Sequence, residues 1–576
     1  MKPRNHRVPH GACALLAACL LLAPGRSPEA AVLRWTGLGS SPLWSDASNW
    51  DGLSVPGDGD ALWFGGATAQ LESTFDLTRS FASLSFAADA QAFSLHVQGS
   101  GATLNFNGAG IVNATAGSGP ISQNFYADAG TGGGSLVFSG HAGLNLSEAT
   151  NLRPVNLIAQ GGSAAAAVGG RIVFQDQSAT GTNTYDGLRA DGASAAGASG
   201  GSIVFRGQAL ATRTSSIAIF GGSVLGASGA QASFEGQARV EGALSVFAGS
   251  GGGFGARAVF SGTAVAAAST GIAMAGAESA GAGAEGVTRF EGDSRMSGSA
   301  TTNPGSGTCF SGGRLEFAGH SGHDSSGNAP GLGMAQIANY GGQGAGAHGG
   351  ATVFMDDAFV RGSGLIITNL VAGESGAAGT VGGTTEFRDR SRAGQVTLLN
   401  YGAQAAGPGT LGGATIFSGQ ASAENADISS LSGGVLDAPG GTVRFEGGST
   451  AGTATLRNDG ARVSGAGGGL SSFEGQASAD HALIVNASGE VAGTVGGATR
   501  FAGNAVAGSA HVANGASLSL GGGMGGSTLF SDDANAQHAS IDNEGGFFSG
   551  DNASTSFRDR ASAGQASILN LSLIHI

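Results

Sequence analysis

The stretch from Phe473 to Arg500 reads FEGQASADHALIVNASGEVAGTVGGATR, and it is one copy of a unit that recurs through most of the chain. The unit has the form G-G-x-T-x-F-x-G-x-A-x-A-x-x-A-x-I-x-N and is followed by a glycine-rich connector. The spacing of its marker phenylalanine ranges from 26 residues (Phe234 to Phe260) to 37 residues (Phe317 to Phe354). Self-similarity at such a period predicts a repeat architecture, in which each copy is one structural unit stacked on the next. The marker residues are Phe138, Phe174, Phe205, Phe234, Phe260, Phe290, Phe317, Phe354, Phe387, Phe417, Phe445, Phe473, Phe501, Phe530 and Phe557.

The parity of the apolar positions predicts how each copy folds. Counting Phe473 as position 0, Ala477 and Ala479 at +4 and +6 share its face. Ile484 and Asn486 at +11 and +13 share a face with position +9 after a slip of parity at +7/+8. Such a slip between two period-2 runs is typical of a corner between strands. Phe, Ala and Ile are therefore predicted to face inward, and the intervening Arg, Glu, Gln and Ser to face outward.

The repeat predicts an all-β fold, a parallel β-helix (solenoid) of about 15 coils with a Trp-rich N-terminal cap. Coils stack at about 4.8 Å, so the predicted rod is about 70 Å long. Stacking would align the phenylalanines into one interior column and the +13 asparagines into a ladder of side-chain amides. Asn486 and Asn570 also begin N-x-S sequences, so glycosylation or ligand binding is the alternative role. The ladder residues are predicted to be Asn151, Asn303, Asn400, Asn458, Asn486, Asn514, Asn543 and Asn570.

Composition and charge exclude several classes of protein. The 576 residues include 109 Gly but only 12 Pro, and 11% are charged. Disordered chains are polar and highly charged, and collagen needs Gly at every third residue with abundant Pro, so neither class fits. The net charge is −14 and there is no basic tract. Because binding to nucleic acid depends on clustered Lys and Arg, we expect no nucleic-acid partner.

Residues 1–30 are predicted to be a signal peptide. Basic residues precede a short apolar run over 12–23, and small residues at 23–25 and 30–31 offer cleavage points. The sequence Leu16-Ala-Ala-Cys19 resembles a bacterial lipobox, which would place a lipid on Cys19, although the apolar run continues past this residue. Removal of the signal leaves Cys309 as the single thiol, so no disulfide is expected.

All four tryptophans lie within the predicted cap, residues 31–66. Their pattern, W-x-G…W…NW…P…D…F, resembles the start of secreted bacterial proteins with autotransporter-associated β-strand repeats. That resemblance implies an exported β-solenoid similar to an autotransporter passenger. Physically, the first coil of a solenoid has an open core end, which bulky aromatic side chains can cover; a platform for stacking sugars is the alternative role. The matching residues are Trp35, Gly37, Trp44, Asn49, Trp50, Pro56, Asp60 and Phe64, with Trp63 as the fourth tryptophan.

The remaining boundaries follow from changes in pattern. Residues 67–130 are predicted to form short alternating strands and the first coils, and residues 131–570 the marked repeats. The final residues 571–576 break the repeat and resemble a translated sequencing adaptor. We therefore expect the chain to be a fragment whose continuation would carry any further coils or a region that associates with an outer membrane.

Few residue patterns point to chemistry. His320-Ser-Gly-His323-Asp324 is a candidate metal-binding sequence, but it is one cluster in what we expect to be a polar loop. A polysaccharide lyase or hydrolase would need clustered acids and bases in one groove; the nearest candidates are Asp356-Asp357, Asp532-Asp533 and Arg388-Asp389-Arg390. Asp389 and Asp532 occupy position +2, where other copies have Gly, which indicates a turn. The Thr residues at −2 share the parity of Phe and are predicted to point inward, which argues against an outward ice-binding array.

The sequence therefore predicts a secreted, cell-surface or outer-membrane-associated bacterial protein with a structural or adhesive role. No cofactor, metal or catalytic residue is expected. The candidate partners are a host surface, an extracellular matrix or a polysaccharide. The alternative function is a polysaccharide-acting β-helix enzyme, either a lyase or a glycoside hydrolase.

Overall fold

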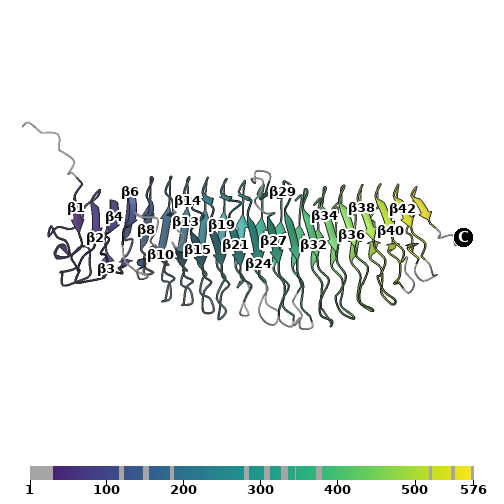
Figure 1. Ribbon diagram of the computed structural model, residues 1–576, viewed down its shortest axis with the longest axis horizontal. Helices are drawn as coiled ribbons and strands as arrows, with labels where there is room; N and C mark the ends of the chain where they lie inside the picture. Colours follow the sequence, from purple (N-terminus) through teal and green to yellow (C-terminus); the bar gives the residue numbers. More distant parts are fainter. Residues whose placement is uncertain are drawn as a thin grey trace, which may run out of the picture.

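The computed structural model describes residues 30–115, 122–146, 155–181, 187–277, 284–303, 312–325, 335–343, 346–371, 379–517, 522–546 and 552–571. The described chain is a parallel β-solenoid of about 16 turns, which confirms the predicted fold class and nearly matches the predicted 15 coils. Figure 1 shows the coils stacked along one long axis from the N-terminal to the C-terminal end, with the connectors projecting along one edge. The only helix in these ranges is the 3-10 helix η1 (Ala47–Asn49).

The first sheet contains the marker phenylalanines and is 20-stranded. From the Phe138 coil onward, each of its main strands ends on the phenylalanine of its coil, in register with the next. Its strands are β1 (Val32–Arg34), β2 (Ala61–Phe64), β4 (Thr78–Phe86), β6 (Thr103–Asn113), β8 (Ser135–Phe138), β9 (Gly143–Leu146), β11 (Arg171–Phe174), β13 (Ser202–Phe205), β16 (Gln231–Phe234), β19 (Arg257–Phe260), β22 (Val287–Phe290), β25 (Arg314–Phe317), β28 (Ala351–Phe354), β31 (Thr384–Phe387), β33 (Ala414–Phe417), β35 (Thr442–Phe445), β37 (Leu470–Phe473), β39 (Ala498–Phe501), β41 (Ser527–Phe530) and β43 (Ser554–Phe557).

The second sheet lies after the corner and holds the ladder positions. Its strands are β3 (Glu72–Phe75), β5 (Ser94–Val97), β7 (Gln123–Ala127), β10 (Val155–Ala159), β12 (Gly187–Ala190), β15 (Ser216–Ile219), β18 (Ala243–Val246), β21 (Gly271–Met274), β24 (Ser299–Thr302), β27 (Gln336–Asn339), β30 (Ile366–Asn369), β32 (Thr397–Asn400), β34 (Asp427–Ser430), β36 (Thr455–Asn458), β38 (Leu483–Asn486), β40 (His511–Asn514), β42 (Ser540–Asn543) and β44 (Ser567–Asn570).

A short third sheet lies between the other two along the middle coils and is 6-stranded. Beyond it, the same positions make isolated parallel bridges, such as Phe359 with Arg392 and Arg392 with Ser422. Its strands are β14 (Leu210–Ala211), β17 (Arg239–Val240), β20 (Val265–Ala266), β23 (Arg295–Met296), β26 (Gly322–Asp324) and β29 (Phe359–Arg361).

The phenylalanines form one column of parallel rings, which is buried except at its last member, Phe557. Phe473 and Phe501 stack with ring centroids 4.7 Å apart and an interplanar angle of 9°, and the other neighbours from Phe138 to Phe557 are also stacked. Ala477, Ala479 and Ile484 are fully buried beside the column. The side-chain parity on both sides of the corner is therefore as the repeat predicts. Position +7, which makes the corner, has a positive φ in copies such as Asp480 (53°).

The asparagine ladder runs along the second sheet. The Asn486 amide donates to the Asn514 side-chain oxygen at 2.7 Å, while the Thr499 hydroxyl donates to the Asn486 oxygen at 2.9 Å. The Thr at −2 thus points inward, as predicted, and its hydroxyl donates a hydrogen bond to the side-chain oxygen of the ladder asparagine. Ladder residues Asn400, Asn458, Asn514, Asn543 and Asn570 occupy equivalent places on their strands.

Two features of the ladder differ from the prediction. Asn303 is exposed, and Thr302 occupies the ladder place opposite Asn339, because the corner between β23 and β24 is one residue shorter than in the regular copies. Asn339 and Asn369 belong to the ladder although the fixed +13 spacing does not select them, since longer corners precede their strands. Asn151 lies outside the described residues.

The tryptophans of the cap do not form one group. Trp35, Trp44 and Trp50 are buried, with the Trp50 ring centroid 5.2 Å from each of the other two. These three rings pack on the first phenylalanines of the core. Trp63 instead points away from the core on β2 and carries the Arg34 guanidinium over its ring at 4.4 Å. Parity explains the difference, because Trp63 lies between the inward-facing residues of its strand.

Candidate functional site

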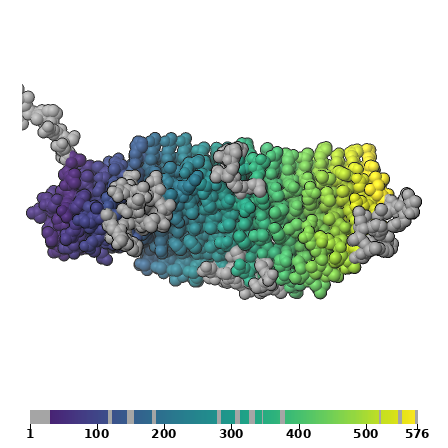
Figure 2. Space-filling view, viewed as in Figure 1, coloured from purple at the N-terminus to yellow at the C-terminus, as the bar shows by residue number. Residues whose placement is uncertain are grey.

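The outer surface of the rod consists of rows of equivalent residues, one per coil. Figure 2 shows the coils as regular ridges that cross the space-filled rod, one beside the next along its long axis. Because neighbouring coils pair in register, residues at the same position lie about 4.8 Å apart along a row. A site on this surface can therefore combine side chains from several consecutive copies.

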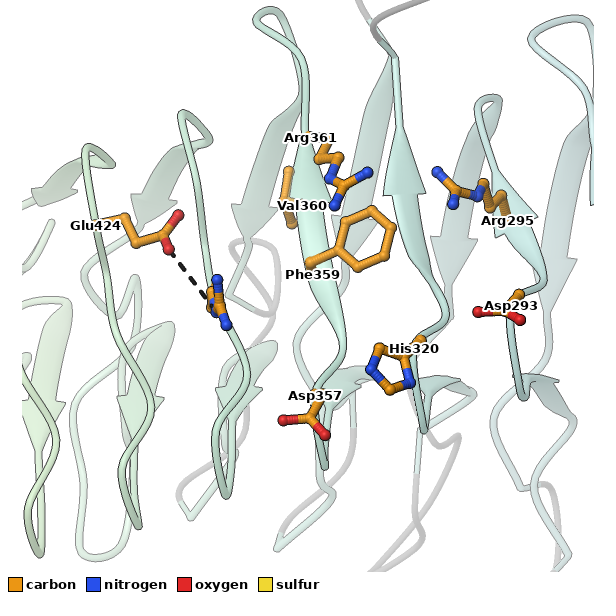
Figure 3. Close-up of a pocket in the computed structure, with 9 residues that line it drawn as sticks. Asp293, Arg295, His320, Asp357, Phe359, Val360, Arg361 and Glu424 are labelled. Atoms are coloured by element: carbon orange, nitrogen blue, oxygen red, sulfur yellow. Dashed lines mark ion pairs between the residues drawn. The ribbon is translucent and has the colours of Figure 1, made fainter.

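The row at position +5 contains a gap that opens a hollow. Its successive members are Arg295, Gly322, Phe359 and Arg392, so one coil lacks a side chain between two large ones. A Cβ atom at Gly322 would lie 2.1 Å from the Phe359 carbonyl oxygen and 3.1 Å from its ring. Phe359 therefore covers the glycine, and a hollow of about 450 Å³ remains beside it (Figure 3).

The row at position +3 forms the second wall of the hollow. It brings Asp293, His320 and Asp357 onto successive coils, followed by Arg390. Arg390 binds Asp357 through one edge of its guanidinium, with Nε donating to Oδ1 at 2.8 Å and Nη2 donating to Oδ2 at 2.9 Å. This pairing holds the pKa of the Asp357 carboxyl below its ordinary value. Among the described residues, the side chains of Asp293 and His320 make no hydrogen bond.

The cations of the hollow differ in how far their charge is neutralised. Arg295 donates to Asp324 at 2.8 Å, and Arg392 lies 4.0 Å from Glu424. The Arg361 guanidinium lies over the Phe359 ring, 4.4 Å from its centroid. Within the described ranges, Arg361 has no carboxylate partner. The hollow thus presents one exposed arginine whose charge is not paired.

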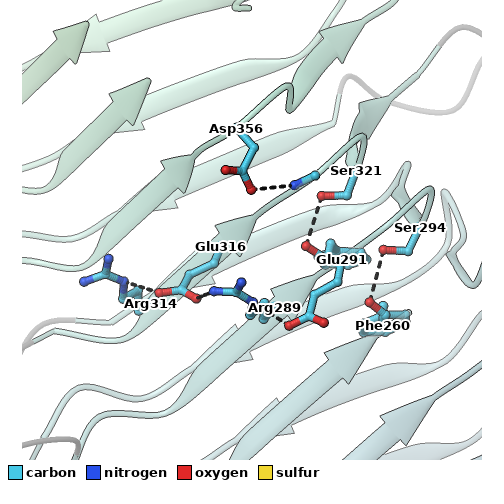
Figure 4. A network of polar contacts seen from close by, with 10 residues as sticks. Phe260, Arg289, Glu291, Ser294, Arg314, Glu316, Ser321 and Asp356 are labelled. Carbon is cyan, nitrogen blue, oxygen red and sulfur yellow. Dashed lines mark hydrogen bonds and ion pairs between the residues drawn. The ribbon is translucent and has the colours of Figure 1, made fainter. Parts of the chain in front are cut away.

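Elsewhere on the rod, some neighbouring charges neutralise one another, whereas other exposed arginines, such as Arg206 and Arg500, make no ion pair with the described residues. On the outer face of the first sheet, Arg289 bridges Glu316 at 2.9 Å and Glu291 at 2.6 Å (Figure 4). A second hollow of about 450 Å³ lies beside these strands and is lined by residues that include Arg257, Arg314 and Glu316, but the charges of Arg289, Glu291 and Glu316 are paired with one another. They therefore act as cross-coil ion pairs of the kind that hold neighbouring turns in register.

The predicted metal-binding sequence does not converge on one point. His320 is exposed at the hollow, whereas His323 is fully buried in the interior row between Met296 and Val360. The sequence predicted a polar loop for this segment. Residues 322–324 instead form strand β26, whose backbone pairs with β23 and β29 of the neighbouring coils. Within the described residues, no group of three or more His, Cys, Asp or Glu side chains could hold a metal ion.

Burial lowers the pKa of His323 to about 4, so this ring is neutral at ordinary pH. Its Nε2–H donates to the Gly298 carbonyl oxygen at 3.2 Å, and within the described residues its Nδ1 has no partner. The ring is therefore a polar member of an otherwise apolar interior row. It contributes to the core and does not line the hollow.

The acidic pairs considered for catalysis have two different roles. Asp389, Asp532 and Asp559 at +2 have φ of 57°, 55° and 57°, which is the left-handed turn conformation that Gly adopts in other copies. Asp533 lies at +3 and is paired with Arg560, in the same way as Asp357 with Arg390. Of the candidates selected from the sequence, the structure brings only His320 and Asp357 together in the hollow.

The sequence analysis did not select most residues of the hollow, namely Asp293, Arg295, Phe359, Arg361, Arg392 and Glu424. The available signal was the departure of one position from its neighbours in consecutive copies. Position +5 changes from Arg to Gly to Phe to Arg within four coils, which is visible once the copies are aligned on their phenylalanines.

Comparisons with known proteins assign no family: no family model matches the chain, and no curated protein is significantly similar to it. Over the described residues, no helix has the length and apolar character needed to cross a membrane.

Proposed function

We propose that the protein is an exported rod that acts at the cell surface or outside the cell, with a structural or adhesive role. The observation that carries this proposal is the in-register stacking of coils, which repeats each outward position along the whole rod. Such a surface offers many weakly binding groups at regular spacing, and several weak contacts made together give a high overall affinity.

The outward rows show how regular this presentation is. At position +3, the Gln177 amide donates to Gln208 at 3.2 Å, and the Gln208 amide donates to Gln237 at 3.1 Å. Asp357–Arg390 and Asp533–Arg560 repeat one bidentate pair at two places in the same row. The rod thus offers extended polar ridges to which a long or repetitive partner could bind.

Adhesion can be tested on a Gram-negative host that displays the full chain. Cells with and without the chain would be placed on surfaces coated with acidic polysaccharide, neutral polysaccharide or matrix protein, and washed under increasing flow. We expect the displayed chain to increase the retained fraction on at least one surface. Equal retention of both cell types on all surfaces would contradict the adhesive role.

Export is tested separately, because it depends on the N-terminal residues and not on the rod. The expected result for the unmodified chain is a shortened product outside the cytoplasm. Leu20→Glu interrupts the apolar run and should leave a full-length product in the cytoplasmic fraction. A wild-type chain that stays full-length in the cytoplasm would contradict export.

A second candidate function, action on a polysaccharide, is favoured by Asp293 and His320. These two residues lie on adjacent coils beside the hollow, and their side chains make no hydrogen bond to other described residues. A carboxylate next to an imidazole can supply a general acid and base. Release of new sugar ends from an acidic polysaccharide, lost in His320→Gln, would support this activity; intact polymer after prolonged incubation would exclude it for that substrate.

A further inference from the structure

We propose that the hollow between β23 and β29 binds a sugar that carries one carboxylate, such as a uronic acid unit of an acidic polysaccharide. This proposal rests on the adhesive function and names the chemical class that one part of the rod recognises. It is argued from the shape of the hollow, from the state of Arg361 and from the mixture of charges around it.

The shape of the hollow suits a unit of a linear chain. Gly322 removes one side chain from the +5 row, and the Arg295 guanidinium lies across this position over the Phe359 ring, 5.3 Å from its centroid. A space of about 450 Å³ that is open to solvent remains beside these side chains. This volume lies within the range of known small-molecule sites. The hollow also lies along a row that continues in both directions, so a longer chain could extend past it over neighbouring coils.

Arg361 is prepared to bind a carboxylate. Its side chain is exposed, is stacked on Phe359 at 4.4 Å and has no carboxylate partner among the described residues. Guanidinium and carboxylate groups form two parallel hydrogen bonds, which are stronger than neutral ones. Because the ring already restricts the guanidinium, less conformational entropy is lost when an anion binds.

The carboxylates of the hollow restrict the ligand class. Asp293, Asp357 and Glu424 can accept hydrogen bonds from hydroxyl groups. The same groups would repel a densely charged polymer such as a nucleic acid or a heavily sulfated glycan. A ligand with several hydroxyls and a single carboxylate per unit satisfies both the acids and Arg361. A uronic acid has this composition.

The test uses the full chain and trigalacturonate, with binding measured by isothermal titration calorimetry. Arg361→Gln removes the guanidinium and keeps a polar side chain of similar length. We expect the wild type to bind and Arg361→Gln to bind at least tenfold more weakly, because a charge-assisted bidentate contact is lost. Methyl esterification of the ligand should weaken binding to the wild type to a similar degree.

The matched control is Arg462→Gln, which removes another exposed arginine, paired with Glu490 at 2.8 Å on a connector. This variant should bind as the wild type does. Equal urea midpoints for all three proteins would show that the coils are intact. Binding that Arg361→Gln leaves unchanged, equal binding of the esterified trimer, or no binding to the wild type would each overturn the proposal.

The failure of this site can be distinguished from failure of the adhesive function. If Arg361→Gln cells are retained under flow as well as wild-type cells while trigalacturonate does not bind, the rod is adhesive through another surface. If neither retention nor binding is seen, both proposals fail.

Discussion

One break in the asparagine ladder shows how strongly single residues depend on their neighbours. Ser430 occupies the ladder place between Asn400 and Asn458. The Asn400 amide nitrogen and the Ser430 hydroxyl are both buried, and within the described residues neither has a partner. The facing −2 position is Val443, where neighbouring coils have a hydroxyl. Both members of the usual Asn–Thr pair are therefore replaced at this coil.

Restoring the pair should stabilise the rod. The side-chain amide introduced by Ser430→Asn should accept a hydrogen bond from the Asn400 amide and donate one to the Asn458 side-chain oxygen. We expect this change to raise the free energy of unfolding by about 1 kcal/mol. Val443→Thr alone should have a smaller effect, because its hydroxyl faces only the short Ser430 side chain, whereas in the double variant this hydroxyl donates to the new Asn oxygen as in neighbouring coils. Urea unfolding of all four proteins gives a double-mutant cycle. Additive effects would contradict the ladder geometry.

His323 should make stability depend on pH. Its pKa is about 4 in the folded protein, below the ordinary value of 6.5, so the unfolded chain takes up the proton first as pH falls. The contribution of His323 to the free energy of unfolding is therefore complete above pH 6.5. It declines by about 1.4 kcal/mol per pH unit below this value and levels off below pH 4. His323→Met matches Met296 in the same row and removes this contribution.

Urea unfolding at pH 7 and pH 5 checks the prediction for His323. Between these values the wild type should lose about 2 kcal/mol more than His323→Met, because carboxylate titration is common to both proteins. Equal losses would show that the ring is not buried in its neutral form.

At the scale of the element, the repeat determines the strands and their parity, but not the lengths of the corners. The alternation around Phe473 predicts which side chains are buried, because a one-residue slip would reverse every strand. The place of Asn303 could not be predicted, since its coil has a corner that is one residue shorter. The hollow was missed for a related reason: it arises from four consecutive coils, and no single copy shows it.

The second glycine of the G-G pair has a packing role that the motif alone does not show. A Cβ atom at Gly497 would lie 2.0 Å from the Asn458 carbonyl oxygen. Cβ atoms at Gly441 and Gly526 would lie about equally close to the carbonyl oxygens of Asn400 and Asn486. These glycines allow the connector to pass close to the ladder strand of the preceding coil.

Gly497→Ala should therefore destabilise the rod by about 1–3 kcal/mol through overpacking. Gly271→Ala is the matched control, because nothing lies within 4 Å of a Cβ atom at that position. Thermal unfolding followed by circular dichroism compares the two variants. A control that loses as much stability as Gly497→Ala would show that the close approach is not responsible.

At the scale of the whole molecule, the proposed function depends on coils that repeat in strict register. Stability in such rods comes from each coil's contacts with its two neighbours. The phenylalanine column lies on the first sheet and the asparagine ladder on the second, so together they fix both the spacing and the register. The outward rows, including the hollow, follow from that register.

The most direct test of this register is a distance between two spin labels on the +5 row. Ser422 and Ser562 lie at this position five coils apart, linked through Thr450, Ser478, Val506 and Asn535. In a cysteine-free background, Ser422→Cys and Ser562→Cys would carry the labels for pulsed electron paramagnetic resonance. Stacking at about 4.8 Å per coil predicts a single narrow distribution near 24 Å. A broad distribution, or a maximum far from this value, would contradict the in-register solenoid.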